Sequence, residues 1–152
     1  MKDRTYYLSR LRASVYSSLP ADPEKEKIRK QMVEWILYRK YWDRNDRMDT
    51  ICEKCGVPRN EVVSFVKNLS GKKYVSLRKE LRVQDAIEML DEHTELSIQD
   101  ISRMVGLTDK SNFRRDFSSV KGTTPFKWRK EKESKNKKWI SGLTVSVRNH
   151  FR

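Results

Sequence analysis

The chain has 152 residues, which is enough for one ordinary domain or two very small ones. Apolar residues make up 36% of it, a share that favours small helical subdomains with thin cores over one large core. The 34 Lys and Arg outnumber the 21 Asp and Glu, and this excess favours a polyanionic partner, either nucleic acid or an acidic membrane surface.

The N-terminal segment, residues 1–23, is interpreted as a linker or an N-terminal helix. Its apolar residues at helical spacing are Leu8, Leu11, Val15 and Leu19. It lacks the apolar stretch of a secretory signal, and no run in the chain approaches the ~18–20 apolar residues that cross a bilayer. We therefore expect a cytoplasmic protein without a membrane partner.

Residues 24–45 form the next segment. Asp22 before Pro23 marks a helix start, and a periodic apolar stripe follows, made of Ile28, Met32, Trp35 and Ile36. This pattern predicts an amphipathic helix from Glu24 to about Tyr41. Polar residues then interrupt it, and Asp46 and Asp49 are candidate caps for the following helix.

A first helix-turn-helix is predicted over 48–71. The inner face of its first helix contains Met48, Ile51, Cys52 and Cys55. Gly56 suits the left-handed turn, and Pro58 suits the first turn of the second helix. The buried stripe of that helix is Val62, Phe65 or Val66, and Leu69, and Gly71 ends it.

The two cysteines, Cys52 and Cys55, form a CxxC pattern inside this predicted helix. At i and i+3 both side chains join the apolar stripe, so we interpret them as core thiols. A redox switch and a metal site are the alternatives. The two histidines are isolated, and no second CxxC completes a zinc site, so no metal or cofactor is predicted.

Residues 74–91 predict one long connector helix of about 27 Å, comparable to the ~34 Å turn of B-DNA. A second helix-turn-helix is predicted over 96–122, with Ser97 as first cap, Gly106 as turn, and Thr108 or Asp109 as second cap. Gly56 and Gly106 are fifty residues apart, and Gly71 and Gly122 are fifty-one apart, which indicates a duplicated unit. After Pro125 we expect a short helix, then a basic tail over 131–152 whose LTVSV run is either a short strand or disordered.

The second helix of the second unit has the composition of a DNA recognition helix. Phe113, Phe117 and Val120 are expected to face inward, so a polar set projects outward: Lys110, Ser111, Asn112, Arg114 and Arg115. Arg is suited to bidentate contact with guanine. The alternative is a solvated face on which Arg115 pairs with Asp109 or Asp116.

The corresponding helix of the first unit presents Arg59, Asn60, Ser64 and Lys67. Arg59 and Lys67 are predicted to contact phosphate; a solvated face is the alternative. The tryptophans Trp35, Trp42 and Trp128 are interpreted as packing residues. Seven Lys or Arg and two Glu lie in 127–138, either along DNA phosphates or in a free tail. No catalytic constellation is found, so no enzyme is predicted.

The segment 46–130 is interpreted as one DNA-binding domain, because its residues from about Met48 to Lys130 resemble the AraC/XylS-type DNA-binding domain. The residues that carry the resemblance are Arg82, Ala86, Met89 and Leu90, then LSIQDISRMVGLTDKSNF and Phe117, then Gly122, Thr124, Pro125, Trp128 and Arg129. Helix 24–41 resembles the extra helix that often precedes this domain. The resemblance implies an all-α fold of two tandem helix-turn-helix subdomains joined by a connector helix. It also implies a bacterial transcription regulator, commonly an activator, that binds double-stranded promoter DNA and contacts RNA polymerase.

The chain departs from the family in its first unit, where Ser64 stands at the usual basic position, Glu61 opposes phosphate and Cys52 replaces a small alanine. An effector domain of the usual size is missing. Two interpretations stand: a short stand-alone regulator, or the C-terminal piece of a longer sensor-regulator joined through residues 6–20. The first rival function is a protein-interaction module that binds RNA polymerase or another regulator, which exposure of Phe65 or Val63 would favour. The second is an enzyme or accessory factor of a mobile element that needs sequence-specific docking on DNA.

Overall fold

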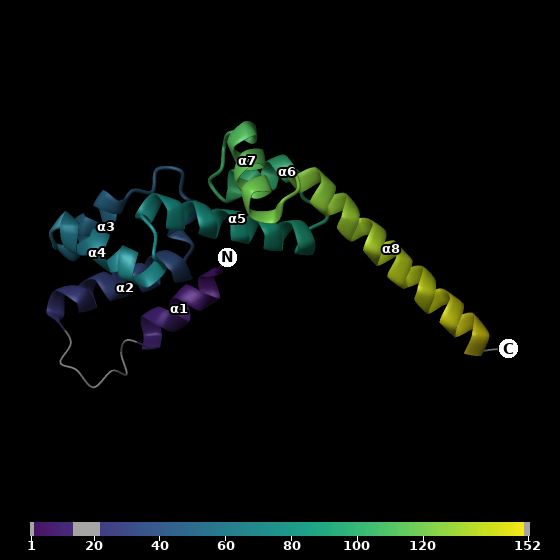
Figure 1. The fold of residues 1–152 in the computed structure, drawn as a ribbon, viewed down its shortest axis with the longest axis horizontal. Coiled ribbons are helices and arrows are strands. Elements are labelled where there is room, and N and C mark those ends of the chain that lie inside the picture. The colour runs from purple at the N-terminus through teal and green to yellow at the C-terminus, as the bar shows by residue number, and fades with distance from the viewer. Residues whose placement is uncertain (1, 14–21, 151–152) are drawn as a thin grey trace.

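The computed structural model describes residues 2–13 and 22–150, the last seven of these by their backbone alone. The elements are α1 (Arg4–Ala13), α2 (Pro23–Leu37), η2 (Lys40–Trp42), α3 (Met48–Cys55), α4 (Arg59–Ser70), α5 (Tyr74–Glu92), α6 (Ile98–Met104), α7 (Lys110–Lys121) and α8 (Pro125–His150). Every regular element in these ranges is helical. Two helix-turn-helix units, α3–α4 and α6–α7, lie along the connector α5 (Figure 1). The predicted all-α fold, with its extra N-terminal helix, is confirmed.

The helix starts of the second unit are capped as predicted. The Ser97 hydroxyl accepts a hydrogen bond from the Asp100 amide (3.0 Å), and the Asp109 carboxylate accepts one from the Asn112 amide (2.9 Å). Each cap satisfies a backbone donor that the first helical turn leaves without a partner. Asp22 caps α2 in the same way, through the Glu24 amide at 3.0 Å.

The candidate caps Asp46 and Asp49 are wrong. Arg47 occupies the N-cap position of α3 and makes no side-chain capping bond. The Asp46 carboxylate instead accepts hydrogen bonds from Trp35 Nε1 (3.1 Å) and from the Tyr74 hydroxyl, which joins α2 to α5. Asp49 forms an ion pair with Arg59. Long-range partners therefore displaced the local capping bond.

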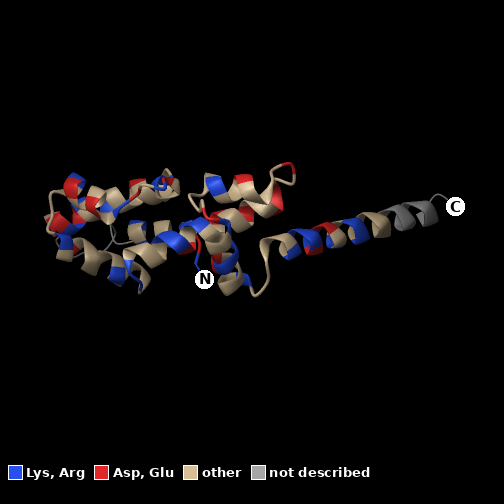
Figure 2. Cartoon of the chain, turned by 90° about the horizontal axis from the view of Figure 1, so that it is seen from above, with Lys and Arg blue, Asp and Glu red and all other residues tan. Residues whose placement is uncertain are grey.

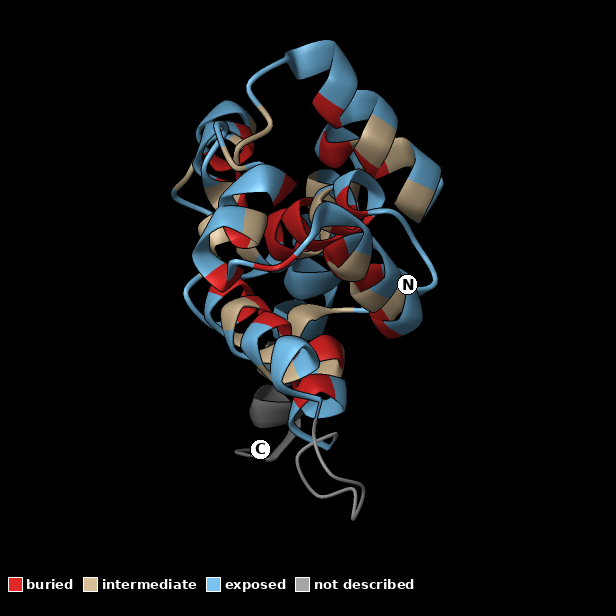
Figure 3. Ribbon diagram, turned by 90° about the vertical axis from the view of Figure 1, so that its left-hand side faces the viewer, coloured by how far each residue is buried: buried red, intermediate tan, exposed pale blue. Residues whose placement is uncertain are grey.

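Two separate cores lie along α5, and buried residues follow the inward faces of the helices (Figure 3). The first core joins α1 to α4 with the first half of α5, and the second joins the rest of α5 to α6 and α7. The buried members of the second core are Val83, Ala86, Ile87, Leu90, Ile101, Val105, Phe113 and Phe117. Each helix-turn-helix unit therefore has its own hydrophobic support.

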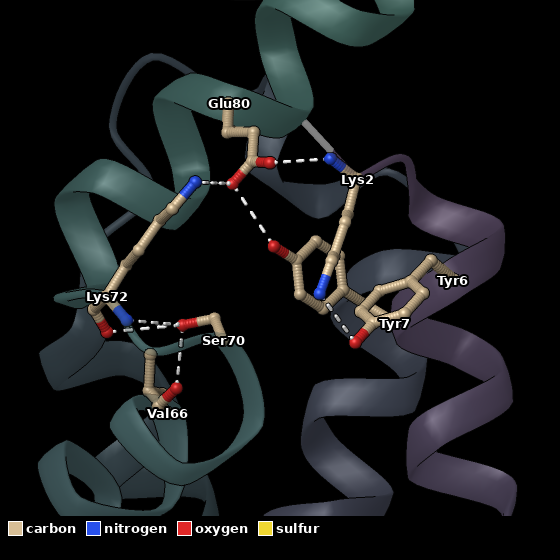
Figure 4. A network of polar contacts seen from close by, with 7 residues as sticks. All are labelled: Lys2, Tyr6, Tyr7, Val66, Ser70, Lys72 and Glu80. Atoms are coloured by element: carbon tan, nitrogen blue, oxygen red, sulfur yellow. Dashed lines mark hydrogen bonds and ion pairs between the residues drawn. The ribbon is translucent and has the colours of Figure 1, made fainter.

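Helix α1 is held against the first unit by a buried carboxylate (Figure 4). Glu80 of α5 accepts hydrogen bonds from the Lys2 backbone amide (2.9 Å), the Tyr7 hydroxyl (3.1 Å) and Lys72 Nζ (2.6 Å). Tyr7, Leu8 and Leu11 complete the contact with the first core. The helical interpretation of the N-terminal segment is confirmed for residues 4–13; Val15, Leu19 and the rest of 14–21 lie outside the described residues.

Helix α2 ends at Leu37, not near Tyr41 as the periodicity predicted. Arg39 adopts a left-handed conformation (φ 50°), and the 3₁₀ turn η2 follows. This reversal brings Tyr41 and Trp42 onto α5, where both donate hydrogen bonds to Asp85. Tertiary hydrogen bonds thus end a helix that the apolar pattern alone would continue.

The C-terminal segment is also different from the expected short helix and tail. Helix α8 runs unbroken from Pro125 to His150 and points away from the other helices (Figure 1). Its first turns are anchored by Trp128 Nε1, which donates to Asp91 (3.0 Å), and by Arg129, which donates to the Leu96 carbonyl (2.7 Å). A strand in LTVSV would need a pairing partner, and the described part of the chain contains no other strand. A helix satisfies its backbone groups internally.

Candidate nucleic-acid interface

Helix α7, the candidate recognition helix, is held on its core side by aromatic packing. Phe113 and Phe117 are buried, and their rings meet edge to face with centroids 6.0 Å apart. Phe117 also meets Trp128 of α8 edge to face at 6.3 Å. These aromatic contacts fix which side of α7 faces the core.

The opposite side of α7 presents the polar set that the sequence indicated. Lys110, Ser111, Asn112, Arg114 and Arg115 are all exposed. In the part of the chain that the structure describes, none of the three cations forms an ion pair, and Asp116 is engaged by Lys79 of α5 at 3.7 Å. The alternative in which Arg115 pairs with Asp109 or Asp116 is therefore not what the structure shows. The side-chain donors of Lys110, Arg114 and Arg115 are therefore exposed and form no ion pair with a described carboxylate.

A groove of about 510 Å³ is lined by α6, α7 and the start of α8. Phe113, Pro125 and Phe126 contribute its apolar wall, and Lys110, Arg114 and Lys127 contribute cations. The sequence placed Lys127 only within a basic stretch and gave Phe126 no role at the surface. The Thr124–Pro125 helix start was the available signal, since it predicts that the next residues emerge beside the recognition helix.

The first unit presents a different surface. Asn60, Ser64 and Lys67 are exposed on α4, as expected, but Arg59 is engaged with Asp49 in an exposed ion pair. Such a pair contributes only ~0–1 kcal/mol, so exchanging it for a phosphate contact costs little. The sequence and structure agree that α4 has fewer free cations than α7.

Beside α4 lies a second groove of about 430 Å³ that the sequence did not indicate. Its apolar residues include Val63 and Val75, which are 43% and 62% exposed. Three cations that sequence reasoning did not select line the same groove: Arg47, Lys73 and Arg78. Arg47 and Lys73 immediately precede α3 and α5, and Arg78 lies in α5, so no single helical pattern groups them with α4.

Positive charge is not confined to the two recognition helices. Figure 2 shows Lys and Arg on both units and along the first half of α8. Seven cations and two glutamates lie in 127–138, and one of the cations, Lys132, is 3.8 Å from Asp91. This distribution of charge favours a polyanionic partner.

The cysteines occupy the positions expected of packing residues. Cys55 is buried and Cys52 is half-buried against the first core. Burial raises the pKa of both thiols above their ordinary value, which disfavours the reactive thiolate. Among the described residues, no group of three or more His, Cys, Asp or Glu is placed to hold a metal ion.

A duplicated helix-turn-helix on one connector, with exposed Arg and Lys on a buttressed recognition helix, defines the class of helix-turn-helix DNA-binding proteins. The comparison with known families agrees. The model of a family described as a helix-turn-helix domain matches residues 51–131, more than half of the chain. This is the AraC-type family that the sequence resembled, and the chain belongs to it.

Solved structures share the fold. The C-terminal domain of the two-component response regulator yesN from Fusobacterium nucleatum is 23% identical, with a TM-score of 0.57 over 66% of this chain and 96% of that one. The C-terminal domain of AraT, a response regulator from Geobacillus stearothermophilus, is 20% identical, with a TM-score of 0.59 over 76% and 88%. The DNA-binding domain of AdpA, a global transcriptional factor, solved with a target DNA, is 18% identical, with a TM-score of 0.61 over 76% and 96%.

No curated protein sequence is significantly similar to the chain. In the described ranges, no helix combines the length and the apolar character needed to cross a membrane.

Proposed function

We propose that this chain regulates transcription in bacteria by binding a specific double-stranded promoter site through both helix-turn-helix units. The observation that carries the proposal is the geometry of α7: two buried phenylalanines fix the helix, and Lys110, Arg114 and Arg115 project from it without carboxylate partners. A helix held in this way can enter the major groove with its donors aimed at base edges and phosphates. The protein then acts in the cytoplasm and without a catalytic step.

The two units have unequal roles in this proposal. On α7 the proposed DNA-contacting residues are Lys110, Ser111, Asn112, Arg114 and Arg115, and on α4 they are Arg59, Asn60, Ser64 and Lys67. Arg115 is the main base-contacting residue, because a guanidinium can bond two acceptors of guanine. Arg59 and Lys67 contact phosphates and position the first unit without selecting sequence.

The test is selection of bound sites from random DNA, followed by affinity measurements on the selected site at several salt concentrations. A DNA-binding regulator enriches one sequence, and its log affinity falls linearly with log salt, because bound phosphates release counterions. Random DNA of the same length should bind about a thousandfold or more weakly. Absence of enrichment, or a salt slope near zero, would overturn the proposal.

A second candidate function is favoured by exposed Val63 beside the α4 groove: the first unit contacts RNA polymerase or another regulator and so activates transcription. Apolar residues at this position do not serve phosphate binding. Val63→Ser should leave DNA affinity unchanged and lower transcription from a bound promoter with purified RNA polymerase. Equal transcription with Val63→Ser and the parent chain would overturn this role.

The likeness to two C-terminal domains of response regulators also suits a C-terminal DNA-binding piece of a longer sensor-regulator.

A further inference from the structure

One residue outside the connector touches both cores. Among the described residues, Trp42 of η2 is the one partly buried side chain that packs against both hydrophobic clusters. It lies ahead of residues 51–131, which the family model matches. A contact that joins the two cores is thus made by a segment outside the matched domain.

The side chain of Trp42 is held by a buried carboxylate of the connector. Trp42 Nε1 and the Tyr41 hydroxyl both donate to Asp85 Oδ2, at 2.7 Å and 2.5 Å. The Arg39 guanidinium lies over the Trp42 ring, 5.3 Å from its centroid, with Nε 3.5 Å from the same oxygen. Asp85 is only 2% exposed, so these charge-assisted bonds are shielded from water.

The backbone of η2 is fixed as well. Arg82, which is buried on α5, donates from Nε to the Tyr41 carbonyl at 2.5 Å and from Nη2 to the Asp43 carbonyl at 2.8 Å. These two bonds hold the residues on either side of Trp42. The Trp42 carbonyl is consequently held at a fixed place beside the connector.

The turn of the second unit rests directly on that carbonyl. Gly106 has φ +88°, and a Cβ added there would lie 2.4 Å from Trp42 O and 3.1 Å from Arg82 Cζ. The equivalent turn glycine of the first unit, Gly56, has φ +63° and nothing within 4 Å of an added Cβ. The two glycines therefore share the left-handed conformation and differ in the close approach.

We propose that Trp42, Arg82, Asp85 and Gly106 form an interdomain clasp that fixes the separation and rotation of α4 and α7. The segment 39–43 then determines which spacing between two DNA half-sites the chain accepts, a consequence that rests on the proposed function. Inserting one base pair moves one half-site by about 3.4 Å and rotates it by about 35°. Two rigidly held recognition helices cannot follow that displacement.

The spacing test compares affinity for the selected site with affinity for sites carrying one or two inserted base pairs. The parent chain should lose about tenfold or more on insertion, the scale of a mismatched contact. Trp42→Ala should lose at most about threefold, since its two units can reorient. Trp139→Ala, at an exposed tryptophan of α8, is the matched control and should keep the parent's penalty.

The two turn glycines provide a second matched pair. Gly56→Ala and Gly106→Ala impose similar left-handed strain, but only Gly106→Ala displaces the Trp42 carbonyl. Gly106→Ala should change the spacing preference, whereas Gly56→Ala should retain it. If Trp42→Ala fails to fold, Trp42→Phe keeps the ring and removes the hydrogen bond to Asp85. Folded Trp42 and Gly106 variants with the parent's spacing penalty would overturn the clasp.

A DNA-free readout separates this inference from the proposed function. Spin labels at Asn68→Cys on α4 and Ser119→Cys on α7, with Cys52→Ala and Cys55→Ala, report the distance between the units. The distribution should be narrow in the parent and broader with Trp42→Ala. Equal widths overturn the clasp. A broader distribution in a chain without DNA selectivity overturns the proposed function and leaves the clasp standing.

Discussion

The outward direction of Arg115 follows from the burial of its neighbours. Phe113 and Phe117 are separated by one helical turn and lie on the core side of α7, so the residues between them cannot all face inward. Arg114 and Arg115 are exposed. The neighbouring carboxylate of Asp116, which could otherwise pair with Arg115, forms an ion pair with Lys79. Substitution of Phe113 or Phe117 would therefore change the orientation of several exposed cations of α7 at once.

Arg115→Ala should weaken specific DNA binding by roughly 1–3 kcal/mol and relax the preference at one base pair, because a bidentate contact to guanine is lost. Site selection with the variant measures both effects. Arg12→Ala, at an exposed arginine in the last turn of α1, is the control and should leave the selected site unchanged. Unchanged affinity and an unchanged site with Arg115→Ala would remove this residue from the interface.

Replacing both thiols, Cys52→Ala with Cys55→Ala, should leave DNA affinity within about twofold and lower the free energy of unfolding by about 1 kcal/mol through lost packing. Burial raises the pKa of both thiols, so alkylation of the native chain should be much slower than alkylation in denaturant. Stoichiometric zinc in the purified chain, or DNA binding that changes on thiol oxidation, would contradict this interpretation.

At the scale of the helix, α4 and α7 occupy equivalent places but present different chemistry. On α7, Lys110, Arg114 and Arg115 form no ion pair within the described residues, whereas on α4 Arg59 is paired and Ser64 has only a short hydroxyl. A short side chain reaches fewer base atoms and discriminates less. Base selection should therefore come mainly from the second unit.

Scrambling the half-site under the second unit should cost more affinity than scrambling the half-site under the first. Ser64→Ala should change affinity by less than about 1 kcal/mol, the scale of one hydrogen bond. Arg59→Ala or Lys67→Ala should weaken all sequences alike and flatten the salt slope by about one unit each. Equal losses from the two scrambled halves would show that the units select sequence equally.

Local patterns predicted the helices of both units well, because apolar spacing, caps and turn glycines are encoded within a few residues. They failed where distant residues decide the conformation. Helix α2 ends early because Asp85, over forty residues away, binds Tyr41 and Trp42. The cations of the α4 groove and the close approach at Gly106 were also beyond sequence reasoning, since both depend on how separate helices meet.

At the scale of the whole molecule, the connector α5 integrates the N-terminal helix, the η2 turn and both units. Its buried polar residues bind two different neighbours: Glu80 binds α1, whereas Arg82 and Asp85 both bind η2. Buried charges are costly unless they are paired and hydrogen-bonded. The polar positions of α5 therefore specify which elements dock on it.

Glu80→Ala should lower the free energy of unfolding by about 1–3 kcal/mol, because the buried Tyr7 hydroxyl loses its acceptor. Denaturant titration followed by circular dichroism measures the change. Glu92→Ala, at an exposed glutamate of the same helix, is the control and should shift stability by no more than about 0.5 kcal/mol. A similar small shift for both variants would mean that the Glu80 network does not hold α1 in place.

The unequal size of the two cores affects which part of the protein unfolds locally most often. In the described residues the first core has eighteen buried members and the second has eight, so α6 and α7 are supported by far less buried apolar surface. Amide hydrogens in α6 and α7 should therefore exchange with solvent through sub-global openings that leave the first unit folded. Because α7 is the proposed base-reading helix, bound DNA should slow amide exchange in α6 and α7 more than in α3 and α4.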